Sequence, residues 1–184
     1  MLFRSAAEAW PRRFLFVGRY LPIKAVDVLV AAYREYRRSV AHPWPLTACG
    51  TGPLQTLLAD DGIEDRGFVQ PARLAAVFAA AGAFILPSRS DAWGQAIVEA
   101  QAAGLPVICS QGCGASETVK DFHNGFVVPI EDARALARSM RWMHEHHGLL
   151  AEMGRRAQQA AAAYRAERWA DTQVALCERL LERG

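Results

Sequence analysis

Features that mark several large classes of protein are missing from this chain of 184 residues. No apolar run approaches the roughly 18 residues that a membrane-spanning helix needs, and the N-terminus lacks the apolar core of a signal peptide. The charges nearly cancel, with 21 lysines and arginines against 19 aspartates and glutamates, which argues against nucleic-acid binding. We therefore expect a soluble, cytoplasmic protein that does not bind nucleic acid and in which no membrane association is encoded.

Cysteine is scarce and histidine forms no complete metal site. The four cysteines are Cys49, Cys109, Cys113 and Cys177. Their spacing matches no zinc motif, and because Cys49 and Cys109 each end an apolar run, we expect buried free thiols in a reducing compartment. His144, His146 and His147 lie close together without a cysteine or carboxylate to complete a ligand set. We predict a solvated helix end there and no metal site.

What the chain does have is a repeated alternation of short apolar runs and helical patterns. The predicted strands are 14–17, 46–49, 64–67, 83–87, 106–109 and 125–129. The predicted helices are 24–40, 54–58, 71–78, 93–102, 116–120, 133–147, 149–163 and 167–181. Because the apolar runs are continuous, the pattern is typical of a parallel sheet covered on both faces.

The predicted fold is therefore α/β, a Rossmann-like, doubly wound parallel sheet of about six strands with a helical C-terminal tail. We assign it to residues 14–165, after a linker-like segment at 1–13. A final helix at 166–184 either packs back on this domain or extends toward another one. Ligands of such sheets bind at the carboxyl ends of the strands, so the loops there hold the candidate site residues.

The first two of these loops contain cations and glycines. Arg19 and Lys24 follow the first strand, with Lys24 at the start of a predicted helix. Two cations beside free helix N–H groups suit a phosphate, although two solvated surface charges would explain the same residues. Gly50 and Gly52 follow the second strand and resemble a phosphate cradle, but a turn with close backbone approach explains them better.

The loop after residue 87 carries an acid before a helix and a second acid on that helix. Asp91 precedes the predicted helix and Glu99 lies on it, eight positions later. The helix start offers unpaired N–H groups. These groups belong to Trp93, Gly94, Gln95 and Ala96. The carboxylates suit sugar or ribose hydroxyls and the N–H groups suit a phosphate or sugar oxygen, unless Ser90 or Asp91 simply caps the helix. The next loop, 110–117, has glycines that allow a ligand to approach the backbone closely.

Taken in order, these motifs resemble the C-terminal, nucleotide-sugar-binding domain of GT-B glycosyltransferases, specifically the retaining group 1 type (family 4). The resemblance covers about residues 14–181. It rests on Phe16-Val17-Gly18-Arg19 with Lys24, Gly50-Thr51-Gly52-Pro53, Gly67-Phe68-Val69, Ser90 to Gly94 with Glu99-Ala100, Ala103 to Ile108, Glu117, and Asn124-Gly125. Asp91 stands where the family usually has glutamate, so its carboxylate reaches about 1 Å less.

The resemblance implies roles for these residues in binding a UDP-sugar or GDP-sugar donor, with no metal ion or other cofactor required. Arg19 and Lys24 would hold the diphosphate, and Asp91 would contact the donor sugar. Glu99 would accept hydrogen bonds from the ribose. The backbone N–H groups around 94–96 would contact sugar and phosphate, and the loop near 67–69 would flank the base.

The same resemblance implies that this chain is half of an enzyme. The family places a sugar or lipid-linked acceptor on an N-terminal domain, which is absent from these 184 residues. We therefore expect the isolated chain to bind the donor without completing retaining sugar transfer. Two alternatives remain: a non-catalytic binding or assembly module derived from the same fold, and half of a sugar-nucleotide epimerase-like enzyme.

Overall fold

Six parallel strands form a single sheet in the order β3-β2-β1-β4-β5-β6. The strands are β1 (Phe14–Val17), β2 (Leu46–Cys49), β3 (Ile63–Asp65), β4 (Ala83–Leu86), β5 (Val107–Ser110) and β6 (Gly125–Val128). The computed structural model describes residues 10–164, so the predicted helix at 166–184 and Cys177 lie outside the described residues. The strand order reverses between β1 and β4, as in dinucleotide-binding folds, and it confirms the Rossmann-like α/β prediction.

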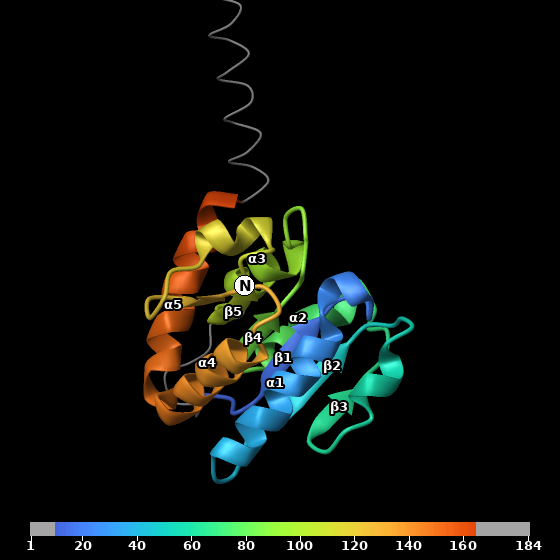
Figure 1. The fold of residues 1–184 in the computed structure, drawn as a ribbon. Coiled ribbons are helices and arrows are strands. Elements are labelled where there is room, and N and C mark those ends of the chain that lie inside the picture. Colours follow the sequence, from blue (N-terminus) through green and yellow to red (C-terminus); the bar gives the residue numbers. More distant parts are fainter. Residues whose placement is uncertain (1–9, 165–184) are drawn as a thin grey trace, which may run out of the picture.

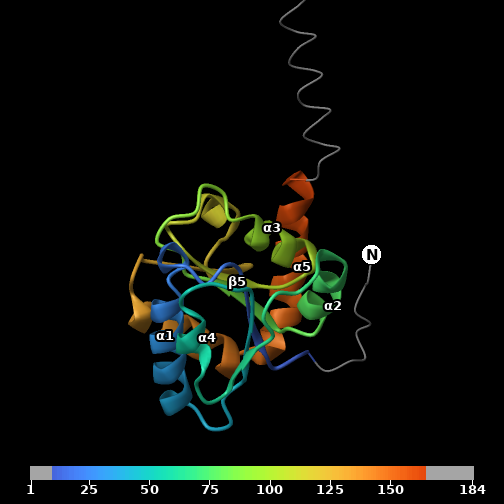
Figure 2. The same ribbon diagram turned by 90° about the vertical axis from the view of Figure 1, so that its right-hand side faces the viewer.

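Helices cover both faces of this sheet. The α-helices are α1 (Val26–Ser39), α2 (Pro71–Ala79), α3 (Gln95–Ala102), α4 (Ala133–Glu145) and α5 (Leu150–Ala161). Figures 1 and 2 show α1 and α4 side by side on one face and α2, α3 and α5 on the other. Short 3-10 helices lie at Pro22–Lys24, Gln55–Leu58, Gly114–Thr118, His147–Leu149 and Ala162–Tyr164. Within residues 10–164, none of the helices has the length and apolar character needed to cross a bilayer.

The core follows the hydrophobic pattern of the sequence. All residues of β2, β4 and β5 are buried, as expected for strands sandwiched between two helical layers. Helix α1 buries the apolar positions that recur every three or four residues. These positions are Val26, Leu29, Val30, Tyr33 and Tyr36. The thiols of Cys49, Cys109 and Cys113 are buried and free, which confirms the expectation for the first two.

The largest differences from the predicted elements lie where single residues adopt left-handed backbone. Ala25 has φ 53°, so α1 begins at Val26 and Lys24 ends a 3-10 turn instead of starting the α-helix. Gly94 has φ 87°, so α3 begins at Gln95 and not at residue 93. The predicted helices at 54–58 and 116–120 are 3-10 turns. Hydrophobic periodicity does not detect a local reversal of φ, because the side-chain pattern continues across it.

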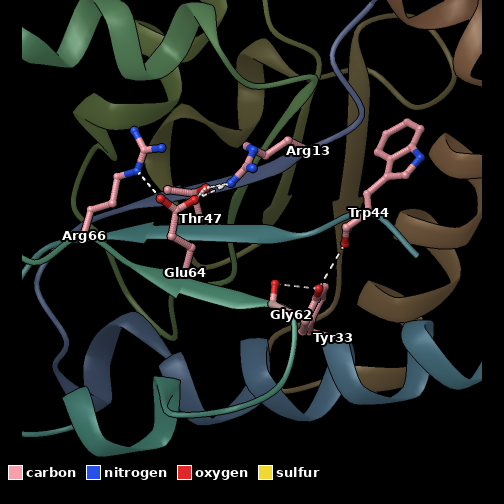
Figure 3. Close-up of polar contacts among 7 residues, drawn as sticks. All are labelled: Arg13, Tyr33, Trp44, Thr47, Gly62, Glu64 and Arg66. Carbon is pink, nitrogen blue, oxygen red and sulfur yellow. Dashed lines mark hydrogen bonds and ion pairs between the residues drawn. The ribbon is translucent and has the colours of Figure 1, made fainter. Parts of the chain in front are cut away.

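Polar contacts secure the exposed edge strand β3 (Figure 3). The Arg13 guanidinium bonds the hydroxyl of Thr47 at 2.6 Å and the carboxylate of Glu64 at 2.5 Å. Arg66 pairs with the other oxygen of Glu64 at 2.8 Å. At the amino ends of the strands, the Tyr33 hydroxyl lies 3.0 Å from the carbonyl of Trp44 and 2.9 Å from that of Gly62. Arg13 thus joins the segment before β1 to the far edge of the sheet.

The beginning of the described chain also packs on the domain. Trp10 donates its indole N–H to the carbonyl of Gly82 at 2.9 Å. A Cβ at Gly82 would lie 1.9 Å from the carbonyl oxygen of Pro11, so the two backbones are in close contact. Residues 10–13 of the segment that we expected to be linker-like therefore lie against the sheet.

A histidine sits in the seam between α1 and α4. The Tyr36 hydroxyl accepts the Trp44 N–H at 2.8 Å and lies 2.8 Å from Nδ1 of His144. Because the phenol oxygen is already an acceptor, its own hydrogen is best placed on an unprotonated Nδ1. The His144 ring also packs on Trp44, with centroids 5.4 Å apart. Burial, reinforced by nearby Arg12, lowers the pKa of His144 below its usual 6.5.

This lowered pKa predicts a loss of stability in mild acid. Between the folded pKa and the unfolded value near 6.5, the unfolded state binds more protons, so protonation favours unfolding. The contribution of His144 is complete above pH 6.5 and declines as the pH falls toward the folded pKa. Urea unfolding at pH 7.5 and 5.5 measures it, and His144→Gln should show a smaller difference between the two. An equal difference in both proteins would contradict this.

Candidate functional site

Four loops that carry the predicted site residues meet at the carboxyl edge of the sheet. They follow β1, β2, β4 and β5, four neighbouring strands in the order β2-β1-β4-β5. Because all pairings are parallel, the loops that leave these strands emerge on the same side. Residues about 70 positions apart in sequence, such as Lys24 and Asp91, are thereby brought together.

The decisive contact at this edge is an ion pair between Lys24 and Asp91. The ammonium lies 2.5 Å from the carboxylate oxygen, and the two side chains are only 21% and 17% exposed. Partial burial makes such a pair stronger than a fully solvated one. Helix α3 has Gly94 at its N-cap and no side chain capping it, so the interpretation of Ser90 or Asp91 as a helix cap is wrong.

Arg19 lies on the same loop as Lys24 but is not paired with an acid in the described chain. Its side chain is exposed, and it forms no hydrogen bond or ion pair with any part of the chain between residues 10 and 164. Of the two predicted cations, Lys24 is therefore compensated by a carboxylate and Arg19 is not. The loop after β1 thus carries one cation that is paired and one that has no partner in the described chain, and an unpaired cation attracts an anion.

None of the four N–H groups that the sequence indicated around the start of α3, those of residues 93–96, has an acceptor within residues 10–164. Gln95 and Ala96 are the first two residues of the helix. The N–H of Ile97 bonds the carbonyl of Gly94 at 2.8 Å. Trp93 lies before the helix, and its carbonyl accepts the N–H of Ala115 at 2.6 Å.

Glu99 lies one turn farther along α3. At a rise of about 1.5 Å per residue, it is about 6 Å along the helix from Gln95. Its side chain is exposed and has no ion pair in the described part of the chain. Desolvation raises the pKa of Glu99 above its usual value, and a hydrogen bond from Gln95 partly offsets this. The structure thus places Glu99 on the same helix as the free N–H groups but not in contact with the Lys24–Asp91 pair.

The glycines of the second loop are required by packing against the first loop. A Cβ added at Gly50 would lie 1.9 Å from the carbonyl oxygen of Gly18. One added at Gly52 would lie 2.5 Å from the carbonyl oxygen of Tyr20. No side chain fits at such distances, so close backbone approach accounts for both glycines, as the alternative interpretation held. A phosphate contact by these residues remains a separate prediction.

The glycines of the loop after β5 pack in the same way, against the loop after β4. Gly112 approaches the backbone of Arg89, where a Cβ would lie 2.4 Å from the carbonyl oxygen. Gly114 approaches Ala92, with a corresponding distance of 2.3 Å. Two backbone hydrogen bonds at Asp91 join the two loops: its N–H donates to the carbonyl of Gly112, and its carbonyl accepts the N–H of Gly114. These glycines therefore position Asp91, and their approach to a ligand is not needed to explain them.

Two residues that the sequence did not single out contact these loops. Tyr164 packs on the ring of Trp93 with centroids 5.3 Å apart, and its hydroxyl donates to Glu117 at 3.0 Å. The guanidinium of Arg89 bonds three other segments near the edge, at Pro22, Asp27 and Glu131. Neither belongs to a recognisable motif. Proximity of Arg89 to Asp91 in sequence is the one signal that could have drawn attention to it.

The three clustered histidines point to different partners. His144 bonds Tyr36, His146 stacks on Trp142 with centroids 4.4 Å apart, and His147 contacts Arg12 at 3.1 Å. The described residues contain no group of three histidine, cysteine or acidic side chains placed to hold a metal ion.

Comparison with known proteins shows the family to which the chain belongs. The family model described as Glycosyl transferases group 1 matches residues 3–160. This chain belongs to that family. It is 36% identical over 166 residues to a D-inositol 3-phosphate glycosyltransferase of Streptomyces avermitilis, covering 82% of this chain and 36% of the relative. A protein of the same name from Nocardia farcinica is 34% identical over 178 residues, covering 89% and 39%.

Solved structures of glycosyltransferases share the fold. Sucrose-phosphate synthase from Thermosynechococcus elongatus superposes with a TM-score of 0.80 at 25% identity, covering 96% of this chain and 47% of that one. The pneumococcal O-GlcNAc transferase GtfA, solved in complex with UDP and GlcNAc, gives 0.79 at 21% identity, covering 96% and 37%. The GT-B fold of this domain is thereby confirmed. The chain spans well under half the length of the curated relatives that it matches.

The glycine packing predicts that Gly50→Ala destabilises the domain. The new Cβ would overlap the carbonyl oxygen of Gly18, and forcing such a contact typically costs about 1–3 kcal/mol. Thermal unfolding measures the loss. Gly148→Ala is the matched control, because nothing lies within 4 Å of a Cβ there, and it should leave the melting temperature within about a degree or raise it. Equal stability of the two variants would contradict the packing role of Gly50.

Proposed function

We propose that this chain binds a nucleotide-diphosphate sugar, a UDP-sugar or GDP-sugar, as the donor half of a retaining glycosyltransferase. The observation that carries this proposal is the Lys24–Asp91 pair at the carboxyl edge of a Rossmann-like sheet, together with Arg19 on the same loop as Lys24, unpaired within residues 10–164. Membership of the glycosyl transferase group 1 family supports it.

The cations suit the chemistry of the leaving group. As the bond between sugar and diphosphate breaks, negative charge builds up on the departing nucleoside diphosphate, and fixed positive charges stabilise it. Arg19 offers a free guanidinium and Lys24 an ammonium that Asp91 already holds in place. The free N–H groups of Gln95 and Ala96 add dipoles of the same sign. These groups supply the stabilisation that a metal ion would otherwise provide.

The acids and the third loop suit the rest of the donor. Asp91 presents its second carboxylate oxygen for a sugar hydroxyl while the first holds Lys24. Glu99 is free to accept from the ribose. Phe68, 65% exposed, borders a hollow of about 540 Å³ with Arg66 and Arg73. A planar base can stack on the exposed ring, in agreement with the prediction that the loop at 67–69 flanks the base.

The transfer itself requires more than this chain in our proposal. A sugar or lipid-linked acceptor would be held by a second, N-terminal domain facing the donor edge, and the curated relatives are more than twice as long as this chain. The names of those relatives describe their own substrates. The test of the proposal is therefore donor binding, which also separates it from a non-catalytic assembly module.

Donor binding predicts stabilisation by nucleoside diphosphates without metal. In the presence of a chelator, UDP or GDP at saturating concentration should raise the melting temperature of the chain, because a ligand that binds only the folded state stabilises it. Arg19→Ala or Lys24→Ala should weaken nucleotide affinity by roughly tenfold or more, since each removes a charge-assisted hydrogen bond. Titration by calorimetry gives the affinities.

Arg34→Ala is the control for these variants. Arg34 pairs with Asp60 near the amino end of β3, on the opposite edge of the sheet, so its loss should leave nucleotide affinity unchanged. A chain that responds to neither nucleotide would contradict donor binding. Stable pairing with another protein chain, without any nucleotide response, would identify an assembly module instead.

A further inference from the structure

Arg89 is the most highly connected charged side chain at the carboxyl edge of the sheet. Its Nη1 and Nη2 bond the two carboxylate oxygens of Asp27 at 2.9 and 2.7 Å. Its Nε bonds Glu131 at 2.6 Å, and Nη1 also donates to the carbonyl of Pro22. One planar group thus holds the 3-10 turn that ends at Lys24, the first turn of α1 and the loop before α4.

These contacts leave Arg89 little capacity to serve as a phosphate ligand, since only one N–H group remains without a bond in the described chain. Four of its five N–H groups are engaged, and two carboxylates surround its single positive charge. The hydrogen bonds from Arg89 hold the pKa of Asp27 below its usual value, so this carboxylate stays ionised. Arg19 is the opposite case, exposed and unpaired within residues 10–164. Arg89 therefore acts on the ligand edge through other residues.

The residues that Arg89 holds include backbone in an unfavourable conformation. Ala25 has φ 53° and Glu131 has φ 62°, and residues with a Cβ rarely adopt this left-handed region because it is sterically unfavourable. Such conformations persist where surrounding contacts fix them. Ala25 lies between Lys24 and the helix that carries Asp27, and Glu131 bonds Arg89 directly. Arg89 bonds Pro22 and Asp27, which flank Ala25, and it bonds Glu131 itself.

The contacts of Arg89 lie next to the Lys24–Asp91 pair in both loops. The backbone N–H of Arg89 donates to the carbonyl of Ile23 at 2.8 Å. The next residue, Lys24, reaches across to Asp91, which lies two positions after Arg89. The bond between Arg89 and Ile23 and the ion pair between Lys24 and Asp91 therefore link the loops after β1 and β4 at two adjacent points. The side chain of Arg89 adds further bonds to the loop after β1 and to the start of α1.

We propose that Arg89 is a positioning residue that fixes the Lys24 loop through Asp27 and Pro22, and so sets the affinity for the donor diphosphate. This inference rests on the donor binding proposed above. A lysine cannot take the same role, because a single ammonium lacks the planar fork that binds both oxygens of Asp27 at once.

The test is a double-mutant cycle in nucleotide affinity, measured by calorimetry with whichever of UDP and GDP the full chain binds more tightly. Arg89→Gln should weaken binding about tenfold in the otherwise unchanged chain. In a Lys24→Ala background the same substitution should have less than a twofold effect, because the residue through which it acts is gone. Arg89→Lys should not restore binding. A generally destabilised protein would lose affinity equally in both backgrounds.

Two further variants keep the result interpretable. Asp27→Asn leaves Arg89 in place but removes the charged partner of its fork, and should weaken binding in the same direction even if Arg89→Gln folds poorly. Arg34→Gln removes an ion pair elsewhere and should leave affinity unchanged. Unchanged affinity in Arg89→Gln, or an equal loss in both backgrounds, overturns the positioning role while donor binding stands. Failure of the unmodified chain to bind either nucleotide overturns donor binding and this inference with it.

Discussion

The parallel pairing of β1 with β4 is the constraint on which this domain depends. Phe14 lies opposite Ala83, and Leu15 lies opposite Phe84. Every other strand is added outward from this central pair, with β2 and β3 on one side and β5 and β6 on the other. Because the chain reverses its direction of winding here, the loops after β1 and β4 are not separated by a crossover helix. The first supplies cations and the second supplies an acid.

The edge that results is built mainly by contacts between loops. At Gly50 the loop after β2 lies so close to the backbone of the loop after β1 that no Cβ would fit between them. At Gly112 the loop after β5 approaches the loop after β4 in the same way. Such contacts remove freedom from segments that have no regular structure. They hold Lys24 and Asp91 within bonding distance of each other, and such preorganisation would lower the conformational cost of binding the donor that we propose.

Charge at this edge is divided between groups that hold the protein together and groups left free. Arg89 and Lys24 are paired with acids, whereas Arg19 is unpaired in the described chain and Glu99 has no ion pair there. The difference follows from surroundings: Arg89, half-buried, has two carboxylates within bonding distance, whereas Arg19 is exposed. A chain with nearly balanced total charge can therefore still present a local positive site.

The sequence alone determined the fold class, the strands to within two residues and the family, because continuous apolar runs, helical periodicity and glycine-bounded loops are local patterns. It also placed Arg19, Lys24 and Asp91 at one edge. The pairing of Lys24 with Asp91, the true start of α3 and the bracing by Arg89 were decided only by the tertiary structure. These depend on left-handed residues and on partners more than 60 positions apart, which no local pattern encodes.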